Sequence, residues 1–486
     1  MRIKESHLQG TQASSFFIIA LSVSILLSAF LLSELSIPSA ILVAVGFSIF
    51  VLTFASTRLA IYLLIFSMLL SPEFGAVSGG VAEGRSIVVR FDDILLVVIS
   101  LSWLARLAIV KERLGLFRRT PLGRPIASYV SVVAIATIMG MIVGRVQPVS
   151  GFFYTLKYVE YIIVFYMIVN HLETTEQAKN IIKATFITCA IICLYAIYQI
   201  PAGGRVTAPF EGEGGEPNTL GGYLVLMLSM ISGLLLTTRR HREKVTFALL
   251  GILIIIPLMY TLSRSSWIAL VPMYVTFLAF STRKFPLVIT AALFICLSPF
   301  LLPEQVVDRA VTTFEEEKWN GTTERIAGVA FDPSTSERIS RYRRSLGRWT
   351  RHPMLGYGVT GGGFIDGQFL RTLEETGLIG LTVMLWLLFY IFRAAHKNYL
   401  RLNDPFFGGL SLGLMGGVAA LLGHAVGSST FIIVRIMEPF WLMVAIVVRA
   451  PHLSRKEPDE PQIDDAKAQL KERLRDERPI EREVVR

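Results

Sequence analysis

The chain has 486 residues, of which 53% are hydrophobic, and a mean hydropathy of +0.56. This composition excludes an ordinary soluble globular protein and is typical of a protein that crosses a membrane many times. The formal net charge of +10 is, in such a chain, first a signal of how the loops are distributed across the membrane. The three cysteines, Cys189, Cys193 and Cys296, lie in apolar runs and indicate neither a metal site nor a disulfide framework.

Apolar runs of roughly 17–25 residues, with some shorter ones, predict an all-α transmembrane bundle of about 12–14 helices. The polar N-terminus is followed by an apolar run without a clear cleavage site, which predicts a retained helix rather than a signal peptide. In chain order, the predicted spans are 15–34, 38–56, 58–71, 91–110, 125–143, 152–170, 180–200, 219–237, 246–262, 265–281, 285–302, 367–393, 406–425 and 429–449.

Basic residues gather in four loops, and with fourteen spans these loops lie on the same side as both termini. By the positive-inside rule that side is the cytoplasm. The four basic loops are those around 111–124, 239–244, 283–284 and 393–401. The loops predicted to face outward are 71–90, 144–151, 201–218 and 303–366.

The same reasoning divides the chain into five parts. They are a cytoplasmic N-terminus (1–14), N-terminal transmembrane helices (15–302), a large extracytoplasmic loop (303–366), C-terminal transmembrane helices (367–449) and a charged cytoplasmic tail (450–486).

The outward loops carry conspicuous polar residues. A Gly- and Pro-rich segment runs from Arg205 to the helix expected near residue 219, where Asn218 stands at a natural N-cap position. Arg264 stands at a very short turn between two apolar helices. Either this arginine snorkels to the membrane interface, or it points into an outer cavity.

The segment 336–352 is rich in arginine and has helical spacing. Four basic and two aromatic side chains fall together on a 3.6-residue period: Arg338, Arg341, Arg348, His352, Tyr342 and Trp349. A solvated basic face is the simpler interpretation for Arg343, Arg344 and Arg351. Arginine and aromatic side chains on one face are also suited to hold a pyrophosphate and a sugar ring. Nucleic acid is not an expected partner, because this segment is predicted to face out of the cell.

A glycine-rich turn, 353–363, follows this segment, and Asp366 comes next at the predicted start of a helix. Backbone amides at such a turn bind anions, which makes Gly356 and Gly358 candidate substrate-binding residues. For Asp366 two interpretations stay open. It is either an electrostatically favourable residue at a helix start or a general base for an acceptor hydroxyl.

Four further titratable residues are reserve candidates: His424, Glu375, Lys157 and Glu160. His424 is predicted near the outer end of a helix. Lys157 and Glu160 are about one turn apart within one predicted span, and mutual pairing is the alternative to a role in the site. No His, Cys and Asp residues have metal-ligand spacing, so neither a metal nor another cofactor is expected.

Five short motifs occur in a distinctive order. They are Arg205 followed by Pro217-Asn218-x-x-Gly-Gly-Tyr-Leu, Leu-Ser-Arg264-Ser-Ser-Trp, Ser336-Glu-Arg338 ahead of Tyr342, Pro353-Met-Leu-Gly356-Tyr-Gly358, and Leu373-x-Glu375-x-Gly377-Leu-Ile-Gly. Their order, their spacing and the outward loop resemble those of the O-antigen ligase and polymerase-like family of polytopic membrane glycosyltransferases. The resemblance covers residues 150–400 well and the earlier helices by topology only.

The resemblance implies a GT-C-like fold in the bacterial inner membrane. It also implies transfer of a glycan from an undecaprenyl-pyrophosphate carrier to an acceptor glycan or lipid, in contact with membrane lipids and a possible chain-length regulator protein. Arg205, Arg264 and Arg338 would neutralise the pyrophosphate, and Asp366 would activate the acceptor, in a metal-independent, inverting reaction. The predicted substrate-binding residues are Asn218, Arg341, Tyr342, Trp349, Gly356 and Gly358.

One departure from the family pattern affects the predicted acceptor. Ligases of the family carry a His-Asn pair eleven and ten residues before the helix glycine, whereas Asp366 and Gly367 stand at those distances from Gly377. This difference favours a polymerase of exopolysaccharide, capsule or O antigen. The alternative within the class is an O-antigen ligase acting on lipid A core or protein.

Two alternatives come from other classes. A transporter or flippase of lipid-linked glycan should carry charges along a path through the membrane and show repeated halves. The polar residues are instead concentrated in one outer loop, and no internal repeat is evident. A non-catalytic assembly scaffold would leave the arginines solvated and dispensable.

Overall fold

The computed structural model describes residues 37–71, 73–82, 85–110, 120–209, 215–301, 303–311, 325–326, 329–330, 333–363 and 365–455. These ranges are almost entirely helical, which confirms the predicted all-α class. Within them the exceptions are two short antiparallel hairpins, formed by β1 (Glu73–Ala82) with β2 (Arg85–Arg90) and β3 (Arg325–Ile326) with β4 (Val329–Ala330). Both regions were predicted only as loops.

The apolar helices are α2 (Ile37–Ala55), α3 (Thr57–Leu70), α4 (Phe91–Val110), α5 (Gly123–Ile142), α6 (Pro148–His171), α7 (Thr175–Gln199), α8 (Pro217–Thr237), α9 (His241–Tyr260), α10 (Arg264–Phe280), α11 (Lys284–Leu301), α14 (Gln368–Arg401), α15 (Pro405–His424) and α16 (Val434–Leu453). Each overlaps one predicted span, while the predicted span 15–34 lies outside the described residues. Within the described ranges, eight helices are long and apolar enough to cross a membrane: α5 to α9 and α14 to α16.

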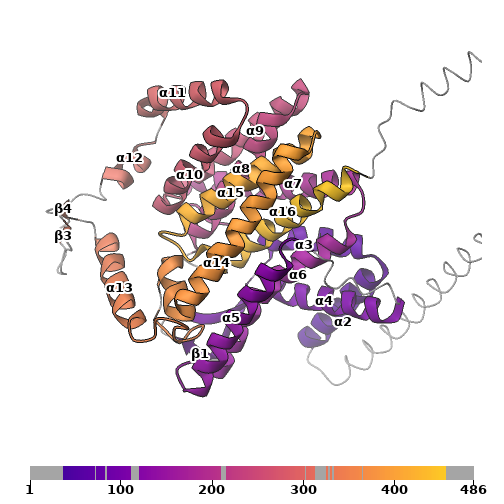
Figure 1. Cartoon of the computed structure of the whole chain (residues 1–486), viewed down its shortest axis with the longest axis vertical. Coiled ribbons are helices and arrows are strands. Elements are labelled where there is room, and N and C mark those ends of the chain that lie inside the picture. The colour runs from indigo at the N-terminus through magenta and orange to yellow at the C-terminus, as the bar shows by residue number, and fades with distance from the viewer. Residues whose placement is uncertain are drawn as a thin grey trace, which may run out of the picture.

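Small residues allow α8 and α15 to pack closely at the centre of the bundle (Figure 1). A Cβ added to Gly233 of α8 would collide with the backbone of Gly409 and Gly413 on α15. Ser229 Oγ donates a hydrogen bond to the carbonyl of Gly413 at 2.7 Å. Close backbone contact and interhelical hydrogen bonds are what hold helices together in lipid, where hydrophobic burial between helices contributes little.

The connections between helices alternate between two ends of the bundle. At one end Val206 donates its backbone N–H to the carbonyl of Tyr260 at 3.2 Å, and Gln368 donates to Ala425 at 3.0 Å. We call this the arginine end, because Arg205 and Arg264 lie in its connections. At the opposite end Thr237 Oγ1 donates to the carbonyl of Pro405 at 2.8 Å.

Two polar helices, α12 (Glu304–Val311) and α13 (Pro333–Trp349), lie between α11 and α14 at the arginine end (Figure 1). The chain then forms an irregular turn and enters α14. Gly377 interrupts α14 with φ 68° and ψ −168°, so the element is two helical pieces joined at this residue. The prediction of one continuous helix through 373–380 is therefore wrong at Gly377.

The interruption at Gly377 serves as a docking point for the preceding turn. Tyr357 donates its N–H to the carbonyl of Glu374 at 2.8 Å, and Leu378 donates to the carbonyl of Pro353 at 2.8 Å. A Cβ at Gly377 would collide with the carbonyl of Met354, and its positive φ also favours glycine. The broken helix therefore fixes the position of the turn 353–358.

Candidate functional site

Arg205 stands in the connection between α7 and α8 and is bound by two other segments. Its Nε donates to the carbonyl of Thr261 at 2.9 Å, and a terminal nitrogen donates to Oδ1 of Asn218 at 3.3 Å. Ser263 Oγ donates to the same Oδ1 at 2.8 Å. The predicted N-cap role of Asn218 is wrong, because Glu216 is the N-cap of α8 and Pro217 occupies the first helical position. The Asn218 side chain instead links Arg205 to the α9–α10 turn.

That turn is conformationally constrained. Leu262 has φ 48°, which is uncommon for a residue with a bulky side chain. On either side of Leu262, Thr261 accepts the hydrogen bond from Arg205 and Ser263 donates to Asn218. Ser263 also caps α10 by accepting the N–H of Ser266. Arg264 is consequently the first residue of α10, presented at the helix start rather than within an apolar helix. Backbone strain of this kind is common at functional sites and supports a role for the turn.

Four guanidinium groups gather at the arginine end. Burial, together with the positive charges of Arg309, Arg338 and Arg264, lowers the pKa of Arg205 to about 10. The three arginines predicted from the motif order are therefore electrostatic neighbours. Arg309 was not among the predicted site residues, although Pro303 ahead of the polar–apolar pattern 304–311 is a helix-start signal. An anion bound among these groups would reduce their mutual repulsion.

Asp366 lies at the edge of this cationic group. Its Oδ2 is 3.8 Å from Nε of Arg338 and 4.0 Å from a terminal nitrogen of Arg341, and all three side chains are 30% exposed. These separations exceed hydrogen-bonding distance, so the ion pairs are loose and the carboxylate stays accessible. Asp366 does not open the helix as predicted, because α14 begins at Gln368 with Gly367 as its N-cap.

The α13 helix is positioned by contacts at its middle and near its end. At its middle, Tyr342 donates its hydroxyl to the carbonyl of Val426 at 2.8 Å. Near its end, Ser345 Oγ donates to Oε2 of Glu374 at 2.6 Å, and Arg348 Nε pairs with Oε1 of Glu374 at 2.5 Å. Trp349, a predicted substrate-binding residue, donates its indole N–H to the carbonyl of Pro353 at 3.1 Å. Its side chain therefore helps to close the turn that follows α13.

The two faces of α13 differ in exposure. Arg338, Arg341 and Arg348 are partly buried against the rest of the molecule, whereas Arg343 and Arg344 are exposed. This is the division that the 3.6-residue spacing predicts. His352 also lies on the inner side, where its ring contacts that of Tyr357 with 4.7 Å between centroids.

Gly356 and Gly358 serve the packing of the glycine-rich turn. Both have positive φ, 66° and 90°, and a Cβ at Gly356 would collide with the carbonyl of Glu374. Their amides are already used, since Gly356 donates to the carbonyl of His352 at 3.1 Å and Gly358 to that of Glu375 at 2.8 Å. These two N–H groups therefore hold the turn on α14.

Glu375 is buried within a fixed network. Its Oε1 accepts from Arg371 Nε at 3.0 Å and from the N–H of Thr360 at 3.4 Å, and its Oε2 accepts from the Tyr158 hydroxyl at 3.3 Å. Buried, paired carboxylates of this kind are usually structural. The arrangement assigns Glu375 to the support of the turn rather than to contact with a substrate.

His424 is buried at the end of α15, next to the first turn of α8. Its Nδ1 is 2.7 Å from Oγ1 of Thr430, and its ring lies beside the backbone of Asn218. A Cβ at Gly222 would lie 3.0 Å from Cε1 of the ring, so the glycine allows this close approach. His424 thus lies beneath the residue that binds Arg205.

Lys157 and Glu160 belong to a separate group. Glu160 is buried on α6, and its electrostatic neighbours are Asp93, Asp92 and Lys157. Glu438 of α16 is buried close to the same acidic residues. The group lies where α4, α6 and α16 meet, and its arginine neighbours are Arg90 and Arg435. In the part of the chain that the structure describes, no cluster of His, Cys, Asp and Glu is arranged to hold a metal ion.

Fold and site together define a polytopic helical membrane protein with a cationic group, and with the accessible carboxylate of Asp366 beside it, at one end of its bundle. Residues 248–385 match the model of a family described as O-antigen ligase (Wzy_C). The matched segment runs from α9 into α14 and includes Arg264, Arg338 and Asp366. The predicted resemblance to O-antigen ligase and polymerase-like proteins is therefore confirmed, and it supports a glycan-handling function in the membrane. No curated protein matches the chain.

Proposed function

We propose that the chain is a polysaccharide polymerase that transfers a glycan from an undecaprenyl-pyrophosphate carrier to a hydroxyl of an acceptor glycan. One observation carries the proposal. Arg205, Arg264 and Arg338 come from three separate segments and gather at one end of the bundle, with Asp366 beside Arg338. Several arginines around one point suit a pyrophosphate, which accepts bidentate hydrogen bonds from the guanidinium fork.

The proposed reaction is a direct displacement. The acceptor hydroxyl oxygen forms a bond to the anomeric carbon, while the bond from that carbon to the phosphate oxygen breaks. The leaving pyrophosphate takes the bonding electrons, and the arginines neutralise its developing charge. The hydroxyl proton passes to Asp366. Attack from the face opposite the leaving group inverts the anomeric centre. The protein side chains that act in this reaction are the three arginines and Asp366.

The loose ion pairs of Asp366 suggest how donor binding and acceptor activation are linked. In the free protein, Arg338 and Arg341 lie 3.8 Å and 4.0 Å from the carboxylate. A pyrophosphate offers these arginines more negative charge and bidentate geometry, so it would compete with Asp366 for them. The carboxylate would then be released toward the acceptor hydroxyl when a donor is present.

Within the class, the alternative is ligation of a finished glycan to lipid A core or to a protein. The carboxylate at residue 366, where the ligase pattern has histidine, favours polymerisation. The alternative of another class is a flippase for lipid-linked glycan. The gathering of the candidate residues at one end of the bundle favours transfer over passage through the membrane.

The proposed orientation places the arginine end outside the cytoplasmic membrane and both termini in the cytoplasm. It rests on the basic loops, of which those around 239–244 and 393–401 lie at the opposite end in the described residues. A single cysteine at the exposed position of Arg344, in a variant with Cys189, Cys193 and Cys296 changed to serine, tests it. Labelling of this cysteine by an impermeant reagent in intact cells supports the orientation, whereas labelling only after lysis contradicts it.

Complementation of a deletion strain tests the proposed reaction. Wild-type protein should restore long surface polymer, and Asp366→Asn should leave single lipid-linked repeats on the outer face. Asp308→Asn, an exposed acid on α12, is the matched control and should behave as wild type. Accumulation of complete polymer on the carrier would identify a ligase instead, and accumulation of repeats on the cytoplasmic face would identify a flippase.

A further inference from the structure

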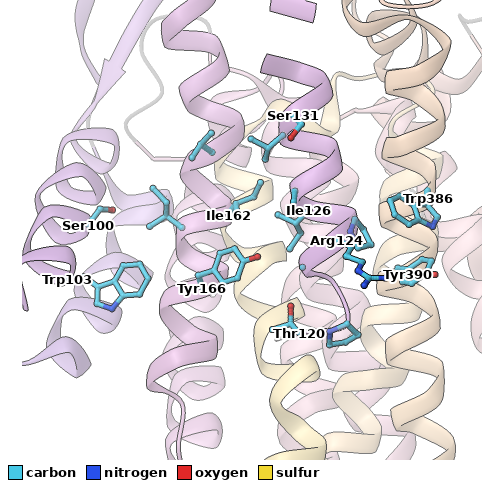
Figure 2. Close-up of a pocket in the computed structure, with 17 residues that line it drawn as sticks. Ser100, Trp103, Thr120, Arg124, Ile126, Ser131, Ile162, Tyr166, Trp386 and Tyr390 are labelled. Atoms are coloured by element: carbon cyan, nitrogen blue, oxygen red, sulfur yellow. The ribbon is translucent and has the colours of Figure 1, made fainter. Parts of the chain in front are cut away.

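A cavity of about 1390 Å³ lies between α4, α5, α6 and α14 (Figure 2). Its lining is mainly apolar and aromatic, with Trp103, Ile126, Val130, Tyr166, Trp386 and Tyr390 among the contributing side chains. The volume exceeds the ~300–1,000 Å³ that is usual for small-molecule sites. A large apolar cavity in the side of a membrane bundle is suited to a hydrocarbon chain.

The cavity lies away from the arginine end. The contribution of α14 is Trp386 and Tyr390, and at 1.5 Å per residue Trp386 is roughly 27 Å along the element from Gln368. The part of α5 that lines the cavity, residues 123–131, is its first half, which begins at the opposite end of the bundle. The cavity is therefore too distant to hold a pyrophosphate bound by Arg205, Arg264 and Arg338.

One cationic side chain borders this apolar space. Arg124, in the first turn of α5, lines the cavity on the side of Trp386 and Tyr390 (Figure 2). Its side chain is exposed and, among the described residues, has no hydrogen bond or ion pair. A guanidinium at the edge of an apolar cavity complements a molecule with a hydrocarbon body and an anionic end.

Further positive charge follows on α14. Arg393 and Lys397 continue the helical spacing of Trp386 and Tyr390, and both are exposed. They also line a small surface hollow of about 360 Å³ at the same end of the helix. Basic side chains at this level of a membrane protein attract anionic lipid headgroups.

We propose that the cavity binds the acyl chains of an anionic phospholipid, with the phosphate-bearing headgroup at Arg124. The apolar lining suits the acyl chains, and the positive charges of Arg124 and of the basic end of α14 suit the anionic headgroup. The site lies in the leaflet opposite the arginine end, so it is distinct from the proposed donor site. The inference does not depend on the proposed transfer reaction.

Native mass spectrometry of the full-length protein in detergent tests this site. The probes are phosphatidylglycerol and phosphatidylethanolamine with the same acyl chains. Wild type should retain phosphatidylglycerol about fivefold more tightly, the size expected for one arginine near an anionic lipid. Arg124→Gln should abolish this preference, and Val130→Trp, which fills the cavity, should reduce retention of both lipids.

Arg242→Gln is the matched control, since this exposed arginine lies at the same end of the bundle on α9, away from the cavity. It should keep the wild-type preference. Equal retention of both lipids by wild type would overturn the proposal, as would an equal loss of preference in Arg124→Gln and Arg242→Gln. Retention of phosphatidylglycerol unchanged in folded Val130→Trp would show that the lipid binds elsewhere and would also overturn it.

Discussion

Asp366 and Glu374 both face arginines of α13, but they are held very differently. Glu374 is 1% exposed, pairs with Arg348 at 2.5 Å, and also accepts from Ser345 and from the N–H of Gly363. Asp366 is 30% exposed, and its ion pairs with Arg338 and Arg341 are 3.8 Å and 4.0 Å long. One carboxylate therefore fixes the end of α13 on α14, while the other remains available beside the start of the same helix.

This contrast separates a structural from a candidate catalytic carboxylate. A buried carboxylate with several donors is costly to disturb, because any donor left without a partner bears the full desolvation cost. A partly exposed carboxylate with long ion pairs can exchange its partners for a ligand at little cost. Glu374 holds the end of α13, whereas a terminal nitrogen of Arg341 is held by Glu337 at 2.5 Å.

The largest effect on activity among the arginines is expected at Arg338. Arg338→Ala should lower the transfer rate by about 10²–10³-fold, as loss of one group that stabilises developing charge typically does. The transfer rate of Arg338→Lys should lie between those of wild type and Arg338→Ala, because lysine keeps the charge but loses the planar fork. Arg344→Ala, on the exposed face of the same helix, is the control. Equal transfer rates for Arg338→Ala and Arg344→Ala would show that Arg338 does not act in the site.

Most of the fold, but only part of the candidate site, could be predicted from the sequence. Apolar runs predict the helices because every backbone polar group in lipid must be satisfied within a helix. The α13 spacing likewise predicts which arginines face inward. The proximity of Arg205, Arg264 and Arg338 depends on how α8, α10 and α13 pack, and only the motif order of the family indicated it. No periodicity connects segments so far apart in the chain.

Two features were missed for identifiable reasons. Gly377 lies in a motif with helical spacing, and the break in α14 becomes evident only where the 353–358 turn docks against it. In the sequence, the signal for this break was an isolated glycine within a helical pattern. Arg309 lies on an eight-residue helix within a long polar segment. Helices this short are marginal on sequence grounds, because tertiary contacts supply most of their stability.

The docking that holds Glu374 in place can be broken at Gly377. Gly377→Ala should destabilise the protein by about 3 kcal/mol, since alanine is strained at φ 68° and its Cβ would meet the carbonyl of Met354. Thermal unfolding in detergent measures the change. Gly347→Ala on α13 is the matched control, because a Cβ there meets nothing within 4 Å and the residue is helical. Similar melting temperatures for the two variants would contradict the docking role.

Glu374→Gln sharpens the comparison with Asp366 directly. It should lower stability by about 2 kcal/mol, because Arg348, Ser345 and Gly363 lose a charged acceptor. Transfer should fall only as far as the folded population falls. If this variant keeps its melting temperature and yet loses transfer, Glu374 is part of the reaction and the distinction between the two carboxylates fails.

The smallest effect is expected on the outer face of α13. Arg343→Gln should change stability by no more than about 0.5 kcal/mol and leave the transfer rate as in wild type, because its side chain is exposed. The same unfolding and transfer assays apply. A loss of more than about tenfold in transfer would show that the substrate contacts both faces of α13, contrary to the arrangement around Asp366.

The most direct test of the account is the transfer rate of purified Asp366→Asn with a lipid-linked pyrophosphate donor, measured beside donor binding and melting temperature. We predict a rate about 10²–10⁴-fold below wild type, with donor binding retained and the fold unchanged, because asparagine keeps the size of the side chain but cannot accept the proton. Asp366→His should recover part of the rate. Transfer by Asp366→Asn at the wild-type rate would contradict the central claim and direct attention to His424.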